Sequence, residues 1–162
     1  MKPLQFAAIP LFLMLLAAAM AGENPSGKDN VGSNLPPRVR GLLIQEMNAI
    51  LGATRNILDG LVRGQHAVVA SNAQAIHDSF ILEQQMTEKD RQALMRAVPE
   101  RFIERDRAFH QLSARLAEAA RNGNSARQRA LFADMVEACA ACHTHHARER
   151  FPGFAEGSNQ AR

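Results

Sequence analysis

Two cysteines stand three residues apart near the end of the chain, and a histidine follows them directly. Cys139, Cys142 and His143 belong to the segment Cys-Ala-Ala-Cys-His, and the chain has 2 cysteines in all. On a helix, both thiols would lie on one side of a single turn, within reach of the two vinyl groups along one porphyrin edge. His143 would then fall under the iron and donate an imidazole nitrogen. This spacing therefore predicts one haem c per chain, attached through Cys139 and Cys142 with His143 as the proximal iron ligand.

Other interpretations of the motif stay open at this point: a redox Cys-x-x-Cys, half of a zinc site, or a chance match that leaves a purely structural helical protein. A redox motif of this kind normally lies near a strand–helix unit, and the sequence shows none. A zinc site needs two more ligands. His145 and His146 are available, but the usual second pair of Cys or His residues is missing.

The first 21 residues favour the haem interpretation because they resemble a secretory signal peptide. Lys2 supplies a positive start, Phe6–Ala19 is an uncharged apolar run, and Ala19-Met20-Ala21 is a typical cleavage site. A transmembrane anchor is the alternative, but the run is shorter than the ~20 residues that span a bilayer. We expect a periplasmic protein that begins at Gly22 and keeps no stable membrane anchor, since bacteria attach haem c outside the cytoplasm.

Composition divides the rest of the chain into three parts. Residues 22–34 are rich in Gly, Ser, Asn and Pro and predict a flexible leader. Residues 35–154 predict one domain, and residues 155–162 a disordered tail. Lys and Arg (19) exceed Asp and Glu (16) only slightly. Because these charges alternate in sign along the expected helices, they indicate solvated faces and no nucleic-acid binding.

Apolar residues recur every three or four positions throughout the domain, which predicts an all-α fold. Four helices are expected at 37–62, 66–85, 99–120 and from 125 to about 150, with a short helix from a Thr87–Asp90 capping box to about 97. A second capping box is expected at Ser125 and Gln128. Joined by short links, these helices predict an antiparallel four-helix bundle with the haem between the first and last helices. The inward positions expected on the first helix are Val39, Leu43, Met47, Ile50, Leu51, Thr54, Ile57, Leu58 and Leu61.

A four-helix pattern with this motif on its last helix resembles the class II c-type cytochromes, the cytochrome c-prime family and its low-spin relatives. The resemblance covers residues 35–154, and its most specific part is 132–143. One departure stands after His143: the family usually has an aromatic residue and then Arg at the third and fourth positions, which here hold His146 and Ala147, with Arg148 one residue later. The resemblance implies a haem protein that exchanges electrons with periplasmic redox partner proteins. It leaves a homodimer open. No enzyme is expected, because the sequence has no Ser/His/Asp set, glycine-rich phosphate loop or carboxylate pair with a clear partner.

The resemblance also implies two states of the iron. In the low-spin branch, a Met from the first helix closes the coordination, and Met47 is the candidate distal ligand on that helix. Met/His ligation raises the haem potential into a range suited to electron transfer. In the other branch the sixth position is open and binds nitric oxide or carbon monoxide, and Met47 would be an ordinary core residue. We expect the electron carrier and keep the gas-binding protein as the alternative.

Overall fold

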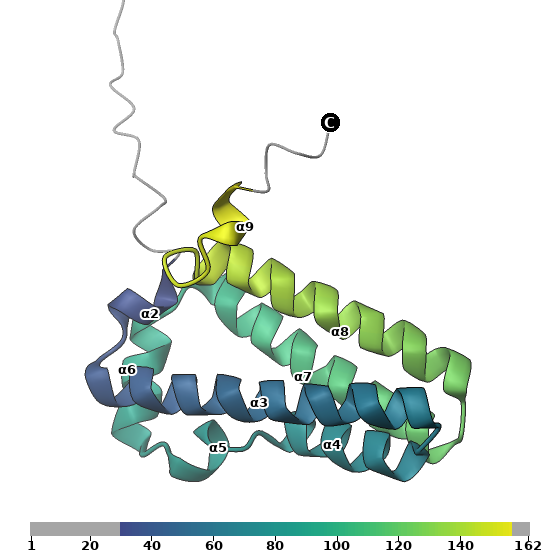
Figure 1. The fold of residues 1–162 in the computed structure, drawn as a ribbon. Coiled ribbons are helices and arrows are strands. Elements are labelled where there is room, and N and C mark those ends of the chain that lie inside the picture. The colour runs from purple at the N-terminus through teal and green to yellow at the C-terminus, as the bar shows by residue number, and fades with distance from the viewer. Residues whose placement is uncertain (1–29, 157–162) are drawn as a thin grey trace, which may run out of the picture.

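The computed structural model describes residues 30–156, and its regular structure is entirely α-helical (Figure 1). This confirms that the fold is all-α, while the expected signal peptide and most of the leader and tail lie outside the described residues. None of the helices in this part of the chain has an apolar stretch long enough to cross a bilayer. The helices are α2 (Val31–Asn34), α3 (Pro37–Arg63), α4 (His66–Asp78), α5 (Leu82–Gln85), α6 (Glu88–Ala97), α7 (Glu100–Arg121), α8 (Ser125–His146) and α9 (Gly153–Glu156).

The four long helices pack in chain order, and each runs antiparallel to the one before it (Figure 1). Hydrogen bonds between neighbouring helices fit this antiparallel order. The Asn56 amide, late on α3, donates to Asn72 in the middle of α4 at 3.1 Å. On α7, Arg105 donates to the carbonyl of Ala141 near the end of α8, at 3.0 Å. α3 packs extensively on α4, α4 on α7 and α7 on α8, whereas α3 meets α8 only sparsely. The arrangement is therefore closed on three sides and sparsely packed on the fourth.

The connection between α3 and α4 requires glycine twice. Gly64 ends α3 with a left-handed backbone (φ 69°), as its position in the sequence predicts. A turn earlier, a side chain at Gly60 would meet Val69 at 3.0 Å, so the missing Cβ allows α4 to approach closely. The two helices consequently form a tight pair.

Two apolar clusters divide the interior. The main cluster joins the four long helices, and a second cluster joins α2, the start of α3, α6 and the start of α7. Buried members of the main cluster include Ile50, Ile57, Val69, Ile76, Leu116, Leu131 and Met135. The second cluster contains Val31, Leu35, Val39, Leu94 and Val98.

A buried carboxylate at Glu46 interrupts the helix that the sequence predicts over 66–85. α4 ends at Asp78, Ser79 adopts a positive φ of 60°, and α5 starts at Leu82. Glu46 is 1% exposed and accepts hydrogen bonds from the Ser79 hydroxyl and the amides of Phe80, Ile81 and Leu82, at 2.5 to 3.1 Å. An uninterrupted helix would commit those amides to its own carbonyls, so the single predicted helix is wrong, and the carboxylate on α3 is the physical reason.

Other boundaries differ for equally local reasons. Residues 31–34, expected within a flexible leader, form α2 because Val31 is buried in the second cluster. The Thr87–Asp90 capping box is confirmed. The one expected at Ser125 is wrong: Asn124 caps α8, and the Gln128 side chain is buried beside His66, 3.0 Å from its ring nitrogen.

Removing the Glu46 carboxylate should destabilise the fold. Glu46→Ala leaves four hydrogen-bond donors without their acceptor, and we expect the free energy of unfolding to fall by about 3 kcal/mol. Ser79→Ala, which removes one of the four bonds, should cost about 1 kcal/mol. Urea denaturation measures both, with the exposed neighbour Gln45→Ala as a control expected within about 0.5 kcal/mol of wild type. Equal midpoints for Glu46→Ala and Gln45→Ala would contradict the role assigned to this carboxylate.

Candidate functional site

The Cys-x-x-Cys-His motif lies on the last two turns of α8, at the point where the buried face of this helix loses its cover. Earlier along that face, Gln128, Leu131 and Met135 are 1–2% exposed. Cys139 and Cys142 continue the same side of the helix but are only partly buried. Neither thiol belongs to a disulfide, and neither is part of the two apolar clusters.

The environment of the two thiols separates the haem interpretation from a redox motif. Burial raises the pKa of Cys139, and burial raises the pKa of Cys142 to about 11, against a smaller opposite effect of the Arg105 charge. A catalytic redox Cys-x-x-Cys lowers the pKa of its reactive thiol, because the thiolate is the attacking species. Both thiols here stay protonated at neutral pH, unlike the activated thiol of a redox motif.

The imidazole of His143 is covered by two phenylalanines that follow α8. Its ring stacks on Phe151 with centroids 4.4 Å apart and planes inclined by 19°. Phe154 lies 6.3 Å away, tilted by 54°. This burial lowers the pKa of His143, so the ring is neutral at pH 7 and keeps a lone pair. A neutral imidazole is the form that binds a metal.

Met47 lies on the side of α3 that faces away from α4. Asn56 and Gly60 lie against α4 and so define the α4 side of the helix. Glu46 lies on its buried face. Because each residue turns a helix by about 100°, Met47 is rotated from Glu46 in the direction opposite to α4. Leu51 and Leu58 follow Met47 on this side, and the three are 37%, 47% and 51% exposed. The expectation that these residues point inward is therefore wrong: Leu42, Glu46 and Ala53 take the buried positions.

Part of the motif lies on the side of α8 that is turned away from Arg105. Arg105 of α7 meets one side of the end of α8, at the Ala141 carbonyl. Rotation by about 100° per residue puts Val136, Cys139 and His143 about 140–160° away from Ala141 on the helix. We call the two sets the α3–α8 seam: Met47, Leu51 and Leu58 of α3, and Val136, Cys139 and His143 of α8.

The α3–α8 seam suits a flat apolar cofactor. Its members are apolar or neutral, yet Met47, Leu51, Leu58 and Val136 are more than one third exposed. Cys139 and Cys142 supply the two thiols that attach a haem c covalently, His143 supplies an imidazole for the iron, and Met47 supplies a thioether. The residues present therefore fit the group that the motif predicts.

The remaining candidate ligands behave differently from one another. His145 is exposed, whereas His146, the other histidine available for a zinc site, is 5% exposed and packs edge-on against Phe102 at 5.5 Å. Arg38 pairs with Asp90 at 3.1 Å, and Arg40 donates to the carbonyls of residues 33 and 35. Across residues 30–156, no three His, Cys, Asp or Glu side chains gather as a metal cluster, so the described chain does not assemble the four donors of a closed zinc site.

The sequence analysis did not identify a polar cluster near the motif, formed by His77, Asp106 and His110. The His110 ring on α7 bonds through Nδ1 to the Ile76 carbonyl of α4 at 2.7 Å, and its Nε2 lies 3.6 Å from Asp106. Its neighbour His77 bonds to the His110 carbonyl at 3.0 Å. The spacing of Asp106 and His110 by four residues is the sequence signal that could have indicated the pair. The cluster ties α4 to α7 one turn away from Arg105.

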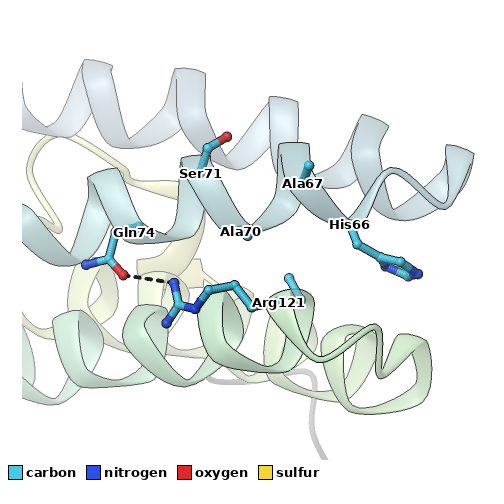
Figure 2. Close-up of a pocket in the computed structure, with 7 residues that line it drawn as sticks. His66, Ala67, Ala70, Ser71, Gln74 and Arg121 are labelled. Atoms are coloured by element: carbon cyan, nitrogen blue, oxygen red, sulfur yellow. Dashed lines mark hydrogen bonds between the residues drawn. The ribbon is translucent and has the colours of Figure 1, made fainter.

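A separate hollow of about 520 Å³ lies at the other end of the α4–α7 contact (Figure 2). Arg121 donates to the Gln74 amide across it at 3.2 Å. Arg121 and Arg105 are 16 residues apart on α7, about 24 Å at 1.5 Å per residue, so this hollow is remote from the motif. The residues that line it are His66, Ala67, Ala70, Ser71, Gln74, Ala120 and Arg121. They supply no nucleophile–base pair, since the Ser71 hydroxyl donates to the Val68 carbonyl.

Comparison with known proteins gives no relative: no family model, no curated protein and no solved structure matches the chain.

The titration of His110 should report its pairing with Asp106. The Asp106 carboxylate, 3.6 Å from the ring, raises the pKa of His110, with the Ile76 carbonyl and the Glu46 charge helping and burial opposing. Because the folded pKa is raised, protonated His110 stabilises the fold below the ordinary pKa of about 6.5, and this contribution is lost as the pH rises through the folded pKa.

NMR titration of the histidine ring protons measures this directly. Asp106→Asn should lower the His110 midpoint and make stability less dependent on pH in that window. Glu104→Gln, which removes an exposed carboxylate elsewhere on α7, is the control and should leave the His110 midpoint unchanged. An unchanged His110 midpoint in Asp106→Asn would contradict the pairing.

Proposed function

We propose that this chain is a periplasmic c-type cytochrome, a carrier of single electrons with one covalent haem per chain. The observation that carries the proposal is the placement of Cys139, Cys142 and His143: one helical turn, two protonated thiols and a neutral imidazole at the half-covered end of α8. The apolar side chains exposed along the α3–α8 seam support it, because a haem packed there would remove them from water.

Each residue of the motif has a defined role in this proposal. Cys139 and Cys142 would hold the haem through thioether bonds, and His143 would donate its lone pair to the iron. The haem supplies the one-electron chemistry of iron when bound. The chain anchors this group, shields it along α3 and α7, and keeps His143 neutral by burying it. An electron carrier of this kind requires no nucleophile or general base.

Haem staining after denaturing electrophoresis tests the attachment. The exported protein should keep the stain on the polypeptide, because thioether bonds survive denaturation. Cys139→Ser and Cys142→Ser should each weaken the stain, since each removes one of the two bonds. Ala141→Ser, which adds a hydroxyl between the two cysteines and leaves both thiols, is the matched control and should stain like wild type. Stain that runs with the dye front in wild type would contradict covalent attachment.

The exposure of Met47 gives the second candidate function a specific basis. A side chain that is 37% exposed on α3 is available to a haem in the seam, but nothing among the described residues fixes it in place. If Met47 stays away from the iron, the sixth position is open, and the protein binds nitric oxide or carbon monoxide instead of carrying electrons. A thioether ligand would raise the haem potential into a range suited to electron transfer, and we therefore favour the electron carrier.

Met47→Ala distinguishes the two functions. For a His/Met-ligated carrier, the variant keeps covalent haem, shifts toward high-spin iron and binds carbon monoxide readily, while wild type resists it. Visible spectra of the reduced protein with and without carbon monoxide measure this. Met95→Ala, at an exposed methionine of α6, is the control and should match wild type. Immediate carbon monoxide binding by wild type, with an unchanged spectrum in Met47→Ala, would instead establish the open-site protein.

A further inference from the structure

The imidazole of His143 lacks the contact that usually orients a metal-bound histidine. Such a histidine normally donates its second ring N–H to a carboxylate, a carbonyl or water, and this bond fixes the plane of the ring. Within residues 30–156, the His143 ring makes ring–ring contacts and no hydrogen bond. Something other than a hydrogen bond must therefore set its orientation.

Phe151 makes the contact that can replace it. The two rings are nearly parallel, 4.4 Å apart at 19°, so a rotation of the imidazole about its Cβ–Cγ bond would drive its edge into the Phe151 face. Phe154 meets Phe151 edge-on, with centroids 6.5 Å apart at 73°, and lies 6.3 Å from the imidazole, so it packs beside both rings. Aromatic pairs in these geometries attract each other beyond the area they bury.

The backbone after α8 is built to return Phe151 to this position. The Phe151 amide donates to the Ala147 carbonyl at 3.0 Å, which reverses the chain directly after the helix. Arg148 Nε donates to the Thr144 carbonyl at 2.6 Å, and the Glu149 amide donates to Asn30 Oδ1 at 3.4 Å. The reversal is thus fastened both to the last turn of α8 and to the segment before α2.

We propose that Phe151 is a positioning residue for His143, which fixes the plane of the axial imidazole by stacking where other proteins use a hydrogen bond. The proposal rests on the function proposed above. It also assigns a role to Phe151, eight positions beyond His143. The third position after His143 holds His146 and not a phenylalanine or tyrosine. Phe154 also contacts the imidazole, but it is tilted by 54° and offers the ring no parallel face.

Electron paramagnetic resonance of the oxidised protein tests this role, because the g-values of haem iron respond to the plane of the axial imidazole. Phe151→Leu keeps an apolar side chain but loses the flat face, and should shift the g-values and broaden the signal. Phe151→Tyr keeps the stacking face and should restore the wild-type spectrum. Phe154→Leu, the same substitution three residues later, should change the spectrum much less. Circular dichroism should show equal helix content in all four proteins, since both residues follow α8.

Three outcomes would overturn the proposal: a wild-type spectrum in Phe151→Leu, equal changes in Phe151→Tyr and Phe151→Leu, or a larger change in Phe154→Leu than in Phe151→Leu. These results in a haem-loaded protein would reject the positioning role alone. A wild-type chain that never acquires haem would reject the cytochrome function, and the role of Phe151 with it.

Discussion

The buried carboxylate of Glu46 is the interaction on which the arrangement of the first helices depends. A carboxylate inside an apolar interior is costly unless hydrogen bonds compensate it, and here four donors from the segment after α4 do so. Those bonds determine where α4 stops and how α3 is rotated about its axis. With Glu46 turned inward, Met47 must lie about 100° away, on the side of α3 that α4 leaves uncovered.

The uncovered side of α3 and the half-buried end of α8 are consequences of the same packing. α8 is held by α7 through Arg105 and Phe102 and meets α3 only sparsely. In an ordinary helical domain the fourth contact would close and bury Leu51, Leu58 and Val136. Here these side chains stay exposed. A cofactor joined to α8 and packed against α3 would complete the interior, so chemistry and packing point to the same place.

The sequence was informative wherever a feature is encoded by adjacent residues. The all-α class, the end of α3 at Gly64, the capping box at Thr87 and the motif on the last long helix all depend on neighbours within a few positions, and the structure places each of these on its expected element. The motif could be recognised for the same reason, because its two cysteines and its histidine lie within five consecutive positions. Whether they hold a haem stays a prediction.

The features that sequence reasoning missed depend on partners far apart in the chain. A glutamate on an amphipathic helix is usually solvated, so the rotation of α3 could not be predicted without the donors 33 to 36 residues after Glu46. Gln128 did not form a capping box because it packs beside His66, 62 residues away. Phe151 reaches His143 only through a chain reversal that Asn30 helps to hold, 119 residues before Glu149. Contacts between residues far apart in the chain determine each of these positions, and the local sequence pattern does not.

Intact-mass spectrometry of the exported, denatured protein, before and after alkylation of free thiols, tests the proposed thioether attachment most directly. Cys139 and Cys142 are the only residues that can react with the alkylating reagent as thiols. A haem protein of the kind proposed would show the mass of the mature chain plus one haem and take up no alkyl group. A bare chain that takes up two alkyl groups would contradict it.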